Sequence, residues 1–162
     1  MVRSARIEDT ANIAQLIREL AEYERLSHEV VLKEADLREQ LFGRTPRAEV
    51  LIAEEDGVVV GFALYFSNFS TFLCRPGLYL EDLFVRPPYR HKGHGRALLR
   101  ELARIAVQRA CGRLEWAVLD WNKPAIEFYR GLGAVLMHEW RIFRLTGDAL
   151  HKVGSDDGRA SS

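Results

Sequence analysis

One stretch of the sequence, residues 78–99, constrains the fold more than any other part of the chain. It begins with an apolar and aromatic run, 78–85, broken only by two acidic residues, which is typical of a central β-strand. Two prolines at 87 and 88 cannot continue a β-ladder, so the strand must end before them. Beyond Gly95, apolar residues recur at helical spacing. The stretch therefore predicts a strand, a turn, a glycine loop and a helix.

The glycine loop has the composition of an anion site. Gly93 and Gly95 allow the backbone to approach a ligand closely, because they carry no Cβ. The first N–H groups of the following helix are unpaired, and they favour an anion together with the helix dipole. The loop also carries four basic residues: Arg90, His91, Lys92 and Arg96. The loop is either a phosphate site or an ordinary turn with solvated cations, and the glycine spacing alone does not decide between them.

Residues 90–95, Arg-His-Lys-Gly-His-Gly, fit the Arg/Gln-x-x-Gly-x-Gly/Ala signature of the GNAT superfamily, the acetyl-CoA-dependent N-acetyltransferases. The runs 79–85 and 121–129 resemble the spermidine/spermine N-acetyltransferase branch, which includes thialysine N-acetyltransferases. Residues 17–24 also resemble that branch, so the likeness extends over residues 2–145. Three separated motifs in the right order are far more specific than the glycine loop alone.

The resemblance implies an α/β (α+β) fold with a mixed, mostly antiparallel central sheet, flanked by helices and splayed between the fourth and fifth strands. It implies that acetyl-CoA is the co-substrate and that its pantetheine arm enters the splay, pairing with the backbone of Leu83, Phe84 and Val85. Further cofactor contacts are expected from Arg90, His91, Lys92, Gly93, His94, Gly95, Arg96, Asn122, Ala125 and Tyr129. No metal is expected, because no carboxylate or cysteine cluster completes a site at His91 and His94.

The remaining periodicities predict one domain over 1–153 and a disordered tail over 154–162. Strands are expected at 2–7, 50–53, 58–66, 78–85, 114–119 and, last, 140–145. Helices are expected after Asp9 or Thr10, either of which can cap, and at 32–42, at 95–111 and from Asn122 to a glycine at 131 or 133. Asp56 and Gly57 predict a hairpin turn, and Gly61 a bulge or close backbone approach.

Composition narrows the function classes. The chain has 162 residues, 48% of them hydrophobic and 28% charged, with Lys plus Arg equal to Asp plus Glu at 23 each. Zero net charge argues against a mainly electrostatic nucleic-acid binder, and no apolar run reaches membrane-spanning length. The first residues lack the apolar core of a signal peptide, and the spacing of Cys74 and Cys111 fits neither a metal site nor a disulfide framework. We therefore expect a cytoplasmic protein with reduced cysteines.

Glu81 is the candidate base, because acetyl transfer requires the acceptor ammonium to lose a proton. Strict alternation along a strand predicts that Glu81 and Asp82 point to opposite faces. A carboxylate on a core strand is costly unless it is paired or hydrated, so Glu81 is either catalytic or part of a salt bridge or solvated face. Asp82 is expected to bind backbone or a basic group.

Tyr129 is the candidate acid for the leaving thiolate. Residues 122–129 match the Asn-x-Pro-x-x-x-Phe-Tyr pattern of the resembled branch, in which this tyrosine donates the proton and the asparagine contacts the CoA arm. The alternative is a core aromatic with an exposed hydroxyl. A backbone N–H of the central strand, that of Leu83, is expected to polarise the thioester carbonyl.

The acceptor site is expected around Tyr23 and Glu24, a pair that lines the amine site in the resembled branch. Glu115 and Trp116 are further candidates for substrate contacts, although core packing explains the tryptophan equally well. The aromatic loop 67–77 either covers the site, packs a dimer or plugs the fold locally. An acidic residue that polyamine enzymes use falls near Thr71 here, which argues against long polyamines.

Three functions follow from these residues. The first is acetylation of a primary amine on a small molecule, such as a diamine, polyamine or thialysine-like amino acid. The second is acetylation of a protein lysine or N-terminus, and the third is a non-catalytic acyl-CoA-binding regulatory domain. A homodimer is expected by resemblance.

Overall fold

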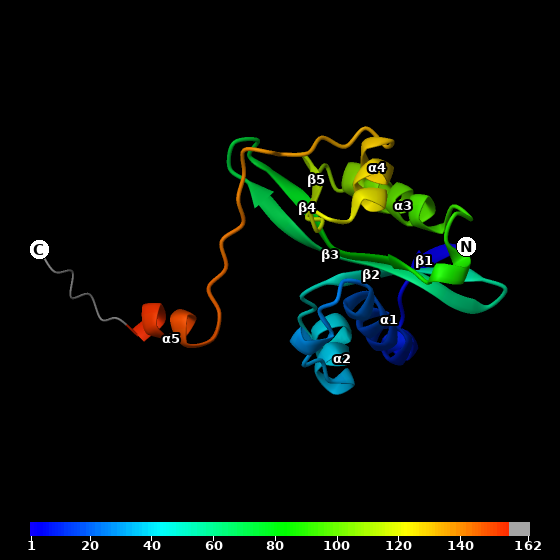
Figure 1. Cartoon of the computed structure of the whole chain (residues 1–162), viewed down its shortest axis with the longest axis horizontal. Helices are drawn as coiled ribbons and strands as arrows, with labels where there is room; N and C mark the ends of the chain where they lie inside the picture. Colours follow the sequence, from blue (N-terminus) through cyan, green and yellow to red (C-terminus); the bar gives the residue numbers. More distant parts are fainter. Residues whose placement is uncertain (156–162) are drawn as a thin grey trace, which may run out of the picture. The chain divides into compact units, whose positions relative to one another are not determined.

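The computed structural model describes residues 1–155 and shows two compact units, Met1–Asp120 and the part from Trp121 onward. The first unit is built on a five-stranded sheet in the order β1-β2-β3-β4-β5, antiparallel except for the parallel pair β4–β5 (Figure 1). Its strands are β1 Val2–Ser4, β2 Glu49–Glu55, β3 Val58–Ser70, β4 Arg75–Val85 and β5 Leu114–Trp116. The predicted mixed, mostly antiparallel sheet is confirmed.

Helices cover both faces of this sheet. Figure 1 shows α1 (Thr10–Tyr23) and α2 (Glu34–Phe42) on one face and α3 (His94–Gln108) on the other. Short 3-10 helices lie at Ile7–Asp9, Ser27–Glu29 and Pro87–Tyr89. The first face buries one apolar cluster, whose members come from α1, α2 and β2 to β4: Ile13, Leu16, Leu20, Leu41, Val50, Ile52, Val59, Phe62, Leu64 and Phe84.

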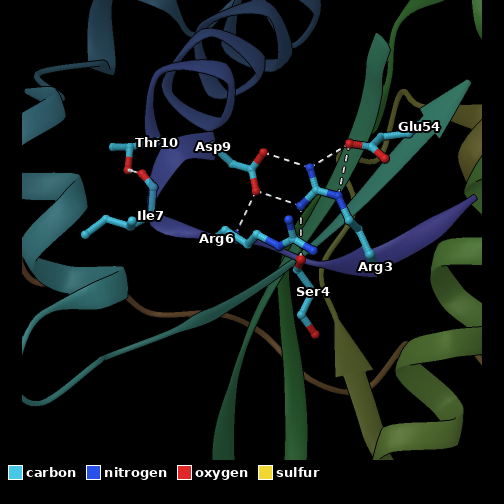
Figure 2. Close-up of polar contacts among 7 residues, drawn as sticks. All are labelled: Arg3, Ser4, Arg6, Ile7, Asp9, Thr10 and Glu54. Carbon is cyan, nitrogen blue, oxygen red and sulfur yellow. Dashed lines mark hydrogen bonds and ion pairs between the residues drawn. The ribbon is translucent and has the colours of Figure 1, made fainter. Parts of the chain in front are cut away.

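A network at the start of the chain ties β1 to β2 and to the entry of α1 (Figure 2). The Arg3 guanidinium binds both carboxylate oxygens of Asp9, at 2.7 and 2.9 Å, and also Glu54 at 2.6 Å. Asp9 also accepts the Arg6 backbone N–H at 2.7 Å. The hydrogen bonds from Arg3, and to a lesser degree the one from Arg6, hold the pKa of Asp9 below its ordinary value. Asp9 is the N-cap residue of α1, one of the two predicted positions, although its side chain makes no capping bond to the helix.

The β2–β3 hairpin turns where the sequence predicts it. Asp56 and Gly57 both have positive φ, 52° and 78°, as a tight two-residue hairpin turn requires. Gly61 fits the predicted close approach, since a Cβ there would lie 2.6 Å from the Phe84 carbonyl oxygen. The next hairpin differs from the prediction, because 67–70 and 75–77 extend β3 and β4 and leave only 71–74 as the turn.

Strand β4 contains a bulge at Glu81. Leu64 of β3 lies opposite Asp82, whereas the next residue, Tyr65, lies opposite Leu80, so Glu81 is an extra residue without a partner. A bulge of this kind resets the alternation of side chains beyond it. Asp82 therefore shares its face with its opposite neighbour Leu64, on the side of α1. The predicted strict alternation through Glu81 and Asp82 is wrong for this reason.

Strands β4 and β5 separate after three paired residues, the last pair being Leu80 and Trp116. From residue 81 to 85, β4 has no ladder partner on that side among the described residues. β5 also ends three residues earlier than predicted, at Trp116. The sheet is therefore splayed between its fourth and fifth strands, as the resemblance implied.

The second unit contains α4 (Lys123–Arg130) and α5 (Gly147–Ser155). Asn122 caps α4 as predicted, with its side-chain oxygen accepting the Ala125 N–H at 3.4 Å. The predicted strand at 140–145 is wrong, since 134–146 form neither helix nor strand. A strand requires a ladder partner, and within its own unit this stretch has none among the described residues. Gly154 and Ser155, placed in the predicted tail, belong to α5, and 156–162 lie outside the described residues.

Candidate active site

The loop between β4 and α3 has the backbone geometry of an anion site. Gly93 is the N-cap residue of α3 with φ of 89°, and a Cβ built there would meet no atom within 4 Å. His91, two residues earlier, also has a positive φ of 62°. A left-handed residue directly before a helix lets consecutive N–H groups point outward at one spot, where a phosphate is stabilised. The helix begins at His94, one residue before the predicted start.

Three basic side chains of this loop, those of Arg90, Lys92 and His94, bind partners within the protein. Lys92 Nζ and His94 Nε2 both bind the carboxylate of Glu55, at 2.5 and 2.6 Å. These two contacts, first that of Lys92, hold the pKa of Glu55 below its ordinary value. Arg90 donates from Nε to the Val85 carbonyl at 2.9 Å. The loop is therefore a shaped segment anchored to the ends of β2 and β4.

The splay presents the backbone of alternate β4 residues. The Arg86 N–H donates to the Val60 carbonyl at 2.9 Å, so the pair of residues 86 and 60 is of the hydrogen-bonded type. Antiparallel alternation then turns the backbone of Phe84 toward β3, and that of Leu83 and Val85 toward the opening. Of the three residues expected to pair with a pantetheine arm, Leu83 and Val85 thus present their backbone groups to the splay.

Three carboxylates, Glu24, Glu81 and Asp82, lie near one another and form an acidic site at the β4 bulge. Burial, then the charges of Glu81 and Glu24, raise the pKa of Asp82 to about 7. Burial also raises the pKa of Glu24 at the end of α1. Within residues 1–155 none of the three forms an ion pair with a cation. The site therefore gathers three carboxylates, as a site for an ammonium group should.

Asp82 is the functional candidate that sequence reasoning placed wrongly. The strand pattern assigned it to the face opposite Glu81, with a backbone or basic partner, whereas the structure gives it acidic neighbours. The signal that could have found it was present in the sequence. Two adjacent carboxylates on a core strand are hard to satisfy by strict alternation, and a bulge resolves the conflict.

Tyr23 lies at the same place as the acidic site. It is the last residue of α1, directly before Glu24, and the Arg90 guanidinium carbon lies 4.6 Å from the centroid of its ring. The same carbon lies 5.6 Å from the ring centroid of Phe84, which is buried on the α1 face. The structure thus brings Tyr23, Glu24, Glu81 and Arg90 together, although they come from three separate segments.

The β5 candidates lie beside the base of the splay. Glu115 pairs in register with Tyr79, and its carboxylate binds Arg113 at 2.8 Å. Burial, then the charges of Glu81 and Glu115, raise the pKa of Tyr79. Trp116 is partly buried and ends the paired part of β5. Tyr79 therefore links the acidic site to β5, a role that the sequence did not indicate.

The remaining candidates belong to the second unit. Asn122 is buried and holds the start of α4, and Ala125 is the residue whose N–H it accepts. Tyr129 is half-buried near the end of α4, with its ring 5.5 Å from that of Phe128. The Asn-x-Pro pattern thus begins a helix that carries Tyr129 about two turns beyond its cap.

In the described part of the chain, no group of three or more His, Cys, Asp or Glu residues is arranged to hold a metal ion. Among those same residues, no helix has both the length and the apolar character needed to cross a bilayer.

The sheet is splayed between β4 and β5, and a glycine loop lies directly before α3. This arrangement is the one expected of the acetyltransferase class. The profile of the acetyltransferase (GNAT) family matches residues 13–134. The chain belongs to this family and is an acetyltransferase. GNAT acetyltransferases use acetyl-CoA.

The similarity to known proteins extends over nearly the whole chain. A thialysine N-epsilon-acetyltransferase from Bos taurus is 42% identical over 164 aligned residues, covering 94% of this chain and 96% of its own. An L-ornithine N5-acetyltransferase from Arabidopsis thaliana is 36% identical, covering 94% and 86%. Among solved structures, an integron cassette protein from the mobile metagenome of V. cholerae superimposes with a TM-score of 0.80 at 29% identity, covering 96% and 97%.

Proposed function

We propose that the protein transfers the acetyl group of acetyl-CoA to the terminal amino group of a small amine, and that a basic amino acid such as thialysine or ornithine is the acceptor. The carrying observation is the acidic site, which is formed by Glu24 at the end of α1 and by Glu81 and Asp82 on β4 at the splay. Relatives that act on thialysine and on L-ornithine at 36–42% identity support the same acceptor class.

The acidic site supplies what the acceptor needs. An ammonium is not nucleophilic, so it must lose a proton before its nitrogen can attack the thioester. We assign proton removal to the pair Glu81 and Asp82, reached directly or through water. Asp82 is the member that titrates near neutrality, which suits a group that takes up and releases a proton at physiological pH. Glu24 and Tyr23 then hold the rest of the acceptor.

The splayed edge of β4 holds the other substrate. The pantetheine arm of acetyl-CoA pairs with the backbone of Leu83 and Val85. The diphosphate of acetyl-CoA lies against the N–H groups at the start of α3. The Leu83 N–H polarises the thioester carbonyl as charge develops on its oxygen. These assignments rest on which backbone groups face the opening.

Tyr129 is assigned as the acid that protonates the departing thiolate, and Asn122 and Ala125 as contacts of the CoA arm. The support is the Asn-x-Pro-x-x-x-Phe-Tyr pattern and the observed capping of α4 by Asn122. Tyr129→Phe removes one hydroxyl, so it is expected to lower kcat by about ten- to ten-thousand-fold while leaving the fold intact. Wild-type turnover in this variant would remove Tyr129 from the mechanism.

The test of the proposed function is a thiol-release assay with acetyl-CoA and a panel of amines. Thialysine, L-ornithine and lysine are expected to be the best acceptors, with diamines and long polyamines weaker. A preference for peptides with lysine or a free N-terminus would instead indicate protein acetylation. Tight binding of CoA without turnover of any amine would indicate a non-catalytic acyl-CoA-binding domain.

We further propose that the protein is a cytoplasmic homodimer. The support for a dimer is the stretch 134–146, which has no strand partner in its own unit and exposes a series of large apolar side chains: Val135, Met137, Trp140, Ile142, Phe143 and Leu145. The support for a reducing compartment is that both cysteines, Cys74 and Cys111, are free. Light scattering over a dilution series tests the assembly, with a monomer at all concentrations as the contrary result.

A further inference from the structure

The side chain of Arg90 touches both halves of the site. Its Nε donates to the Val85 carbonyl at 2.9 Å, and this carbonyl is one that faces the splay. Its guanidinium carbon lies 4.6 Å from the Tyr23 ring centroid, which is the distance of a cation–π contact. One cation thus connects the cofactor opening to the acceptor site.

Each of these two contacts occupies a place that a substrate requires. A pantetheine amide that pairs with β4 at the splay needs the Val85 carbonyl as its acceptor. An ammonium held beside Glu24 and Asp82 would find the Tyr23 ring face occupied by another positive charge, and like charges at contact distance repel each other. Arg90 in this position therefore opposes the binding of both substrates.

We propose that Arg90 is a positioning residue that couples the two substrates, and this proposal rests on the proposed function. In the free protein its guanidinium takes the place of the acceptor's ammonium on Tyr23. When acetyl-CoA binds, the pantetheine arm takes the Val85 carbonyl and the diphosphate draws the guanidinium toward the loop. The place that Arg90 occupied on the ring of Tyr23 is then vacated for the acceptor. Because Arg90 must leave for either substrate, each substrate strengthens the binding of the other.

Calorimetry on the full chain measures this coupling directly. L-ornithine or thialysine is titrated into the free protein and into the protein saturated with CoA, which holds no acetyl group to transfer. In the wild type, CoA is expected to tighten acceptor binding about 5- to 150-fold, the usual range for coupled sites. In Arg90→Ala, the free protein binds the acceptor more tightly than the wild type, and the ratio falls toward one.

Lys92→Ala is the matched control, because it removes an equal charge from the same loop but from a side chain that binds Glu55 rather than Tyr23. It is expected to weaken CoA binding and to keep the coupling ratio. Arg90→Gln serves as a second variant that can still donate to Val85 but carries no charge, and its ratio is expected to fall as well. An unchanged ratio in both Arg90 variants would overturn the proposal.

A second readout does not depend on the acceptor. The protein labelled with 3-fluorotyrosine gives a fluorine signal for Tyr23, assigned by its loss in Tyr23→Phe. CoA alone is expected to shift this signal in the wild type and in Lys92→Ala, and not in Arg90→Ala. An equal shift in Arg90→Ala would overturn the proposal. If no amine binds while the Tyr23 signal behaves as expected, the acceptor assignment and the coupling both fail, whereas the displacement of Arg90 from Tyr23 by CoA stands.

Discussion

The two sides of the β4 splay carry opposite charge, and they differ in how that charge is held. On the loop side, Lys92 and His94 share the carboxylate of Glu55, and the left-handed Gly93 shapes the backbone between them. On the α1 side, burial and then the charges of two acidic neighbours raise the pKa of Asp82 to about 7. A preformed loop favours a ligand that always binds in the same position. A site of crowded carboxylates is stabilised most when a cation binds to it.

The largest expected effect comes from the acidic side. Asp82→Asn keeps the size of the side chain but cannot take up a proton, so kcat/KM near pH 7 is expected to fall about 100- to 10,000-fold. The wild-type pH profile should rise with an inflection near pH 7, and the variant should lack that inflection. Glu81→Gln is the matched change at the neighbouring carboxylate. Wild-type activity in Asp82→Asn would assign the proton transfer elsewhere.

The same substitution is expected to stabilise the protein without substrate. The folded pKa of Asp82, about 7, lies above its ordinary 3.8, so the unfolded chain releases this proton at lower pH than the folded one. The free energy of unfolding therefore falls as pH rises from about 4 to 7. Asp82→Asn removes this loss, and its unfolding free energy should exceed that of the wild type by about 2–4 kcal/mol above pH 7.

Urea unfolding of both proteins at pH 4 and pH 8 measures this effect. The difference should be present at pH 8 and absent at pH 4. A variant that is less stable than the wild type at pH 8 would show that burial and the neighbouring charges do not disfavour the ionised Asp82 carboxylate.

The loop side is tested by Gly93→Ala. A residue with φ of 89° is strained when it carries a Cβ, although the Cβ would meet no atom within 4 Å. The expected cost is about 1–3 kcal/mol of stability, together with weaker CoA binding because the loop relaxes away from its shape. Gly147→Ala is the control, since it has a positive φ of 53° and equally open space at the start of α5. It should lose similar stability and keep CoA affinity in calorimetry.

The smallest expected effect comes from Glu55→Gln. Lys92 and His94 lose their anionic partner, so the positive potential at the loop rises and CoA affinity is expected to increase about two- to fivefold in low salt. The gain should fade as ionic strength rises, because exposed charges are screened. A loss of affinity that persists in high salt would mean that Glu55 acts mainly by holding the loop in shape.

Local sequence signals predicted well wherever one segment determines its own backbone. The Asp56–Gly57 turn, the glycine bend ahead of α3 and the Asn122 cap all depend on residues within a few positions of each other. The mixed sheet and its splay were available through the family resemblance. The limits of the strands were predicted less well, because β3 extends to Ser70 and β5 ends at Trp116.

What the sequence by itself determined is therefore the order of the elements from β1 to α4, the glycine bend ahead of α3, and the residue types that meet at the site. Only the tertiary structure decided that Glu81 is bulged, that Asp82 faces α1, and that Arg90 lies on Tyr23. It also left 134–146 without a strand, against the local pattern. The physical reason is that pairing register, the facing of a side chain, and the partner of a charge are set by residues distant in the chain. No local pattern contains those residues.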